Sequence, residues 1–172
     1  LQRYRIEYQH DAHILMVSQF LLNYPFSKCL FPDALAVVTH LKQRGPVVLV
    51  SDGDAVFQPH KIARAGLFDA VDGQVLIYVH KEEELDDIEA RYPAEQYVLI
   101  DDKLRILSAV KNLWGPRVTT IFSQQGHYAQ SLHVRETYPA ADFSLERIGD
   151  LLQYELDGLV SAQPVVSSGL GR

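Results

Sequence analysis

Apolar and polar residues occur in blocks along the chain, and the most regular blocks predict buried strands that end in polar side chains. Residues 47–50 are four consecutive apolar residues, three of them valine, and a serine, an aspartate and a glycine follow at 51–53. Residues 97–100 repeat this pattern and lead into two aspartates at 101–102. Apolar runs of this kind are typical of strands that are buried on both faces of a parallel sheet.

Helical spacing of apolar residues, with Gly or Pro at the ends of the runs, predicts the remaining elements. Because the predicted strands and helices alternate with short connections, we expect an α/β fold of three layers, a Rossmann-like parallel sheet between two layers of helices. The further strands are expected at 74–79 and 118–122, and the helices before 23–25 and at about 32–45, 59–65, 82–91, 104–114 and 145–156.

The predicted core occupies residues 31–157, between two segments of different composition. Residues 1–30 are rich in aromatic residues and helical in pattern, which predicts a packed helical segment beside the core. Residues 158–172 contain several Ser, Gly and Pro residues, which predicts a flexible tail. The sequence therefore predicts one α/β domain with a helical appendage.

The composition narrows the classes of function. With a net charge of −6, the chain is not expected to have nucleic acid or an anionic membrane surface as its main partner. No apolar run approaches the ~18 residues that a membrane span needs, and no signal peptide opens the chain, so we expect a cytoplasmic protein. Cys29 is the only cysteine, and without a local histidine we expect a buried structural thiol rather than a nucleophile.

Asp101 and Asp102 are the candidate metal ligands. Adjacent carboxylates repel each other unless a cation lies between them, and Mg²⁺ is held by one or two carboxylates, with water and substrate phosphate completing its shell. Alternatively, one of the two acids could cap the following helix while the other is exposed to solvent. The acid pair alone therefore leaves both interpretations open.

Two further strand ends carry groups that suit an anion. Ser51 offers a hydroxyl, and Asp52 and Gly53 add backbone amides, although these residues could also cap a helix. Lys81 follows the strand at 74–79 and could neutralise a phosphoryl group, although a lone lysine is usually solvated. Together with the acid pair, these residues indicate a phosphate site more specifically than any of them does alone.

The order of these groups along the chain resembles that of the haloacid dehalogenase-like (HAD) hydrolases, a family composed mostly of Mg²⁺-dependent phosphatases. Residues 47–53 resemble the family's second motif, residues 75–81 the third and residues 98–102 the fourth. The resemblance covers about residues 10–130 and implies a HAD-like core and a small phosphorylated substrate. The implied roles are catalysis and phosphoryl binding for Ser51 and Lys81, substrate binding for Asp52 and Gly53 beside Ser51, and Mg²⁺ coordination for Asp101 and Asp102.

The chain departs from the family at the first motif, a strand that ends in Asp-x-Asp-x-(Thr/Val) and supplies the nucleophile. Residues 52–56 fit this pattern in isolation, but the other motifs would then have to follow, and no apolar strand after Phe122 ends in two acids. The family's order would place the first motif before Leu1 and would make residues 1–30 the remnant of a helical cap.

A missing first strand would leave a gap in the sheet. In the family's order that strand lies between residues 47–50 and 97–100, so their facing edges would carry unpaired backbone groups, which are costly when buried. We therefore expect another segment, from the same polypeptide or from a partner, to fill the gap. The intact protein would transfer phosphate through an aspartyl-phosphate on an upstream Asp, and the chain as given would be inactive alone.

Two other classes of function fit part of the pattern. A non-catalytic HAD-like protein without the nucleophile could use the cleft or the aromatic helices to bind a partner in a regulatory role. A phosphoacceptor signalling domain also uses an acid pair, a hydroxyl and a lysine, but its acid pair comes first in the chain and its lysine last, the reverse of the order here. His127 is expected to be a structural loop residue and Trp114 a core anchor.

Overall fold

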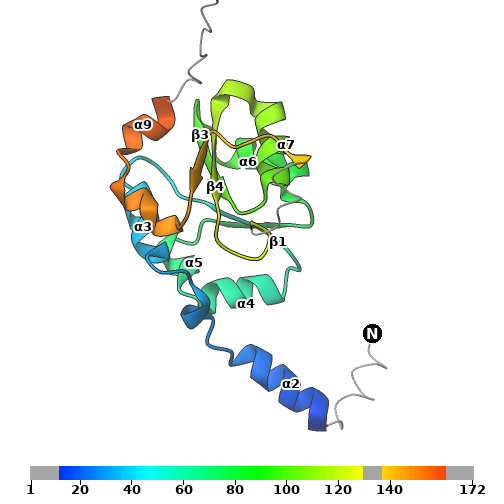
Figure 1. Cartoon of the computed structure of the whole chain (residues 1–172). Helices are drawn as coiled ribbons and strands as arrows, with labels where there is room; N and C mark the ends of the chain where they lie inside the picture. Colours follow the sequence, from blue (N-terminus) through cyan, green and yellow to red (C-terminus); the bar gives the residue numbers. More distant parts are fainter. Residues whose placement is uncertain (1–11, 130–136, 162–172) are drawn as a thin grey trace, which may run out of the picture.

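The computed structural model describes residues 12–129 and 137–161, which form an α/β fold (Figure 1). All strand pairs in this part of the chain are parallel, and the strands form two sheets with the orders β1-β2 and β3-β4-β5. The predicted α/β class with parallel strands is therefore confirmed. The strands are β1 (Leu49–Asp52), β2 (Val75–Tyr78), β3 (Tyr97–Asp101), β4 (Val118–Ser123) and β5 (Phe143–Leu145).

Helices lie between the strands and also before β1 and after β5, largely as predicted. Three starts differ: the helix predicted at 82–91 begins as a separate 3₁₀ turn, the helix expected near Pro32 begins at Ala34, and the helix predicted at 59–65 begins at Phe57. The α-helices are α2 (Ala12–Leu22), α3 (Ala34–Leu41), α4 (Phe57–Arg64), α5 (Leu67–Ala70), α6 (Leu85–Arg91), α7 (Leu104–Trp114) and α9 (Leu156–Ser161). The 3₁₀ turns are η1 (Phe26–Cys29), η2 (Lys81–Glu83), η3 (Gly115–Arg117) and η4 (Ile148–Gln153).

The larger sheet lies between two layers of helices, as the arrangement in Figure 1 shows. On one face, Ile106 and Val110 of α7 and Leu85 of α6 pack together with Val118 of β4. A second cluster joins α3, η4 and α9 to β4 and β5. Its buried members are Val37, Ile121, Leu145, Leu151 and Leu159. Burial of apolar side chains on both faces explains why β4 is a continuous buried strand.

The parallel register brings the ends of the strands to one edge. Asp52, the last residue of β1, pairs with Tyr78 of β2, and Asp101, the last residue of β3, pairs with Phe122 of β4. Open α/β sheets bind their ligands outside the carboxyl ends of such strands. The acidic residues that the sequence placed at strand ends therefore lie at the edge where a site is expected.

In the part of the chain that the structure describes, the two sheets face each other with unpaired edges, that of β1 in the smaller sheet and that of β3 in the larger one. The amides of Leu49 and Gly53 donate to β2 and its flanks, so by the two-residue period of a strand the amides of Val50 and Asp52 face the opposite edge of β1. Within the described residues, no strand pairs with that edge, nor with the edge of β3 opposite β4. The division agrees with the gap expected between these strands, while the segment that would fill it remains a prediction.

The carboxyl-terminal part differs from the single helix predicted at 145–156. Leu145 lies in β5, where it pairs with Ser123, and the following turn is the 3₁₀ element η4. In η4 the fully buried residue is Leu151 and not Leu152, which is 40% exposed. The prediction was wrong because a short apolar run fits a helix and a strand equally well until its partner is known.

The flexible tail predicted at 158–172 also differs in its first residues. Residues 158–161 belong to α9, and Leu159 of this helix is buried against the larger sheet. Packing of this leucine explains why residues 158–161 are helical where the sequence predicted a flexible tail. Residues 162–172, which carry the rest of the predicted tail, lie outside the described residues.

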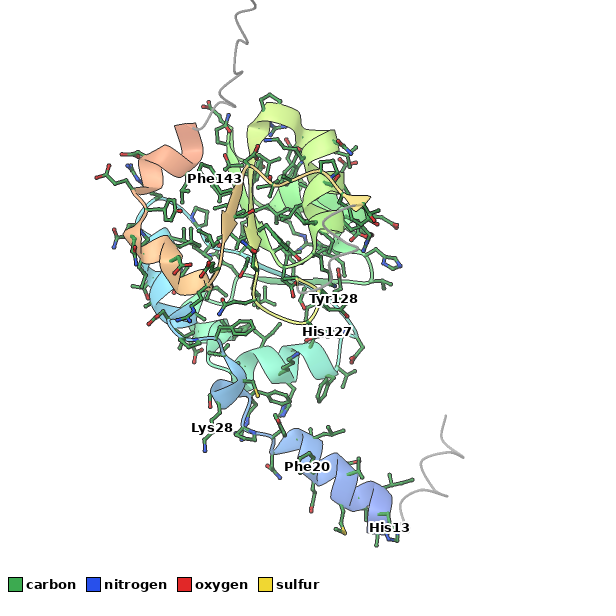
Figure 2. The ribbon with its side chains drawn as sticks, viewed as in Figure 1. His13, Phe20, Lys28, His127, Tyr128 and Phe143 are labelled. Atoms are coloured by element: carbon green, nitrogen blue, oxygen red, sulfur yellow. The ribbon has the colours of Figure 1, made fainter. Side chains whose placement is uncertain are left out.

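The amino-terminal helix forms as predicted but is not packed. α2 ends before Asn23, and none of its residues is buried. It projects from the rest of the molecule, and Figure 2 shows Phe20, which is 64% exposed, on this outlying helix. A helix that is apolar on all sides is normally buried, in the core of a large protein or in a membrane. No helix in the described part of the chain, α2 included, is both long and apolar enough to cross a membrane.

Cys29 is exposed, so the prediction of a buried thiol was wrong. It lies at the end of η1, where Phe26 takes the buried position. The Phe26 ring packs edge-on against Phe57 and His60 of α4, with centroid distances of 5.8 and 6.4 Å. The single anchoring position in this short turn belongs to an aromatic residue, and the thiol faces outward.

Asp142, the residue before β5, holds this strand against β4. Its Oδ2 accepts hydrogen bonds from Lys111 Nζ at 2.7 Å, Thr120 N at 2.8 Å and Thr120 Oγ1 at 2.9 Å. We expect Asp142→Ala to lower the free energy of unfolding by about 2–3 kcal/mol, because it leaves these donors without their acceptor. Urea unfolding measures the change. The exposed Glu95→Ala control should stay within about 0.5 kcal/mol, and equal losses in both variants would contradict this role.

The open edge of β1 predicts uneven amide exchange along one strand. In residues 1–172, the amides of Val50 and Asp52 should exchange with solvent much faster than the amides of Leu49 and Gly53, because the latter two donate to β2 and its flanks. Hydrogen exchange followed by NMR measures all four rates in one experiment. Equal protection of both sets would show that a partner already covers the open edge.

Candidate active site

Two crossed ion pairs join the sheets at their carboxyl edge. Lys81, in the turn after β2, donates from Nζ to Asp101 Oδ2 at 2.5 Å. Lys103, just after β3, donates from Nζ to Asp52 Oδ2 at 3.4 Å. Each pair connects a residue of one sheet with a residue of the other, so the charged groups that the sequence placed at separate strand ends meet at the open edges.

Lys81 is held from several sides and is not a solvated surface lysine. Its side chain is only 15% exposed. Besides Asp101, its Nζ reaches the carbonyl oxygen of Val50 at 3.4 Å, and its backbone amide donates to Asp52 Oδ1 at 3.0 Å. The Val50 carbonyl belongs to the open edge of β1, so the ammonium group lies at the mouth of the gap between the sheets.

Asp101 is the most deeply buried acid of the site, with a side chain that is 5% exposed. Its Oδ2 binds Lys81, and its Oδ1 accepts the amide of Lys103 at 2.8 Å, which stabilises the turn into α7. This one carboxylate therefore both stabilises the turn before α7 and binds Lys81, while its role as a metal ligand stays a prediction.

Asp102 lies beside Asp101 without a cationic partner of its own among the described ion pairs. Burial, and then the charge of Asp101, raise the pKa of its carboxyl group. Its Oδ2 would be 2.8 Å from a Cβ atom at Gly126, a residue with φ of 89°. The loop after β4 thus approaches the acid so closely that only glycine fits.

Two of the predicted phosphate-binding groups are engaged in the fold itself. The Ser51 hydroxyl donates to the carbonyl oxygen of Asp52 at 3.2 Å and takes no part in the crossed ion pairs. The amide of Gly53 donates to Tyr78 O at 2.9 Å, so the expectation that it is free to bind an anion was wrong. Gly53 is needed for another reason, because the Gln58 side chain packs where its Cβ would be.

Asp54 is a helix cap. Its Oδ1 accepts the amides of Phe57 at 2.6 Å and Val56 at 2.9 Å, at the start of α4. These bonds, that from Phe57 first, lower the pKa of its carboxyl group. The second acid of the Asp-x-Asp pattern at 52–56 is therefore used to begin a helix, which favours the assignment of this stretch to the second motif.

Sequence reasoning missed Lys103 as a site residue. The ammonium of Lys103 lies 4.7 Å from the centroid of the Tyr128 ring in addition to its contact with Asp52. Figure 2 shows Tyr128 and His127 together on the loop that follows β4, and both are exposed. A signal was present, because Lys103 directly follows the acid pair at a strand end. Its partners, which come from distant segments, were not visible.

The fold and the site together define a class: a parallel α/β protein with lysines and aspartates at the carboxyl edge of its sheets. A crystal structure of a haloacid dehalogenase-like hydrolase from Burkholderia xenovorans LB400 is similar to this chain, with 53% sequence identity and a TM-score of 0.80. The similarity covers 90% of this chain and 72% of that one. No family model matches the sequence, and no curated protein matches it. The chain belongs to the haloacid dehalogenase-like hydrolases.

The raised pKa of Asp102 predicts a pH-dependent effect on stability. The folded state disfavours the charged carboxylate, so Asp102→Asn should stabilise the metal-free protein by up to about 1 kcal/mol above the raised pKa. This gain should vanish as the pH falls and Asp102 is protonated in both the folded and the unfolded chain. Urea unfolding from pH 3.5 to 8 with EDTA, with Asp86→Asn as an exposed control, measures it. If the Asp102→Asn variant is less stable than the unmodified protein at pH 8, the pKa of Asp102 is not raised in the folded state.

Proposed function

We propose that the intact protein is a Mg²⁺-dependent phosphatase that acts on a small phosphorylated substrate. The observation that carries the proposal is the largely buried Lys81 ammonium at the open edge of both sheets, held against Asp101, the neighbour of Asp102 in the sequence. A fixed cation next to a pair of carboxylates can bind a phosphoryl group on one side and a divalent cation on the other.

The acid pair fits Mg²⁺. No group of three or more His, Cys, Asp or Glu side chains suited to a metal occurs in the described residues, but Mg²⁺ needs only one or two carboxylates. Asp101 and Asp102 provide these, and burial, followed by the charge of Asp101, raises the pKa of the Asp102 carboxyl group. Bound there, the metal ion would neutralise the charge of the phosphoryl group.

The side chains of this chain divide the remaining work. Lys81 binds phosphoryl oxygens and stabilises the charge that they gain in the transition state. The Ser51 hydroxyl can add a hydrogen bond to the same group by rotating away from the Asp52 carbonyl, its contact in this structure. Lys103 balances the charge of Asp52, so a bound cation would take Asp102 and would share Asp101 with Lys81.

The nucleophile is proposed to come from a segment that fills the gap between β1 and β3. Asp52 is bound by the Lys81 amide and by Lys103, and Asp54 caps α4, so neither carboxylate is poised to attack. An aspartate at the end of an inserted parallel strand would lie beside Lys81 and the acid pair. It would form an aspartyl-phosphate that water then hydrolyses, and residues 1–172 alone would be inactive.

Variants of Lys81 and Asp101 test the proposal in a polypeptide that includes the gap-filling segment. Lys81→Met should lower kcat/KM for p-nitrophenyl phosphate by about 100-fold or more, because transition-state charge loses its fixed cation. Asp101→Asn should weaken activation by Mg²⁺, whereas Lys61→Met, at an exposed lysine of α4, should behave like the unmodified protein. Steady-state kinetics over a range of Mg²⁺ concentrations separates these effects. Mg²⁺-dependent turnover by residues 1–172 that survives Asp52→Asn would overturn the assignment of the nucleophile.

A second candidate is a non-catalytic HAD-like protein that binds a partner. The observation that favours it is α2, which presents its apolar side chains to solvent. Exposed apolar surface of this kind often marks an interaction site. The two candidates differ in one result: a binding protein retains no Mg²⁺-dependent turnover even when the gap-filling segment is present.

A further inference from the structure

Glu82, the residue after Lys81, is a buried acid outside the crossed ion pairs. Its side chain is 8% exposed, and its Oε1 is bound by the guanidinium group of Arg105 on α7. Its other oxygen, Oε2, is the one buried side-chain oxygen or nitrogen in the described residues that has no hydrogen-bond partner. The Arg105 side chain is about half exposed, so Glu82 is the buried member of the ion pair.

This arrangement is a poor way to gain stability. A buried carboxylate costs free energy unless both of its oxygens are satisfied, and buried ion pairs often contribute no more than apolar residues of similar size. Where a protein keeps a buried polar group without a partner, that group tends to have a positioning or functional role. The position of Glu82 in the fold indicates what it holds.

Glu82 links the two sheets at the level of the site. It sits in η2, which follows the smaller sheet, whereas Arg105 belongs to α7, which packs on the larger sheet. The same turn carries Lys81, whose amide is bound to Asp52. The Glu82–Arg105 pair therefore fixes the turn at a second point besides the crossed ion pairs, and a shift of η2 would move the Lys81 ammonium away from Asp101.

We propose that Glu82 is a positioning residue that, through Arg105, holds η2 so that the Lys81 ammonium stays at the phosphoryl site. This inference rests on the proposed phosphatase function for its kinetic consequence. Its structural consequence, the fixed position of the Lys81 turn, does not depend on that function. The two can therefore be tested separately.

The kinetic test uses the polypeptide with the gap-filling segment and saturating Mg²⁺. Glu82→Gln and Arg105→Met should each lower kcat about tenfold with KM changed less than about twofold, because a misplaced Lys81 loses transition-state contact more than substrate binding. Combining the two changes should cost no more than either alone, and Arg105→Lys, which keeps the charge, should recover part of the loss. The control Glu83→Gln, at the exposed neighbour, should leave both constants unchanged.

Amide exchange supplies the readout that does not need activity. In Glu82→Gln, the Lys81 amide, which donates to Asp52, should exchange at least about tenfold faster, and in Glu83→Gln it should not. The affinity for inorganic tungstate, a phosphate mimic, should change less than about twofold in both variants, as KM does. If no protein in the set turns over phosphate or binds tungstate, the proposed function fails and the exchange rates alone decide the positioning role. If Glu82→Gln matches Glu83→Gln in exchange, or lowers thermal stability without changing kcat, the inference is overturned.

Discussion

The ion pair between Lys81 and Asp101 is the contact on which the site depends. It reaches from the turn after one sheet to the end of a strand in the other, at a distance of 2.5 Å, with both side chains largely removed from water. A buried charge persists only when a partner of opposite charge and further hydrogen bonds compensate for the lost hydration. The amide of Lys103, the carbonyl of Val50 and the pair formed by Lys103 and Asp52 supply that support.

The ion pair between Lys81 and Asp101 spans the open edges of β1 and β3. Backbone groups at a strand edge need partners when they are buried, and side-chain charges bridge the edges here without pairing the strands. A parallel strand inserted between them would complete the sheet and would end beside Lys81, Asp101 and Asp102. The proposed catalytic chemistry and the proposed completion of the sheet thus depend on the same segment, because it would supply both the nucleophile and the missing strand.

Glycines and caps show how closely the loops are fitted around this edge. Gly126 lets the loop after β4 approach Asp102, and Gly53 lets the Gln58 side chain approach β1, where Gln58 Nε2 donates to Asp52 O at 2.9 Å. Asp54 begins α4 and so directs the chain away from the site. These contacts also separate the neighbouring acids by task, because Asp54 serves the helix while Asp101 and Asp102 remain at the edge.

The sequence by itself determined the α/β class, four of the strands and the placement of Asp52, Lys81 and the acid pair at strand ends, because strand periodicity and the residues that follow a strand are local properties. Only the tertiary structure decided which charges meet, that the Gly53 amide is used within the fold, that Leu145 belongs to a strand, and that Cys29 and α2 are exposed. Each of these depends on segments far apart in the chain. A local pattern can show that a segment is apolar, but it does not encode which distant segment will cover it or pair with it.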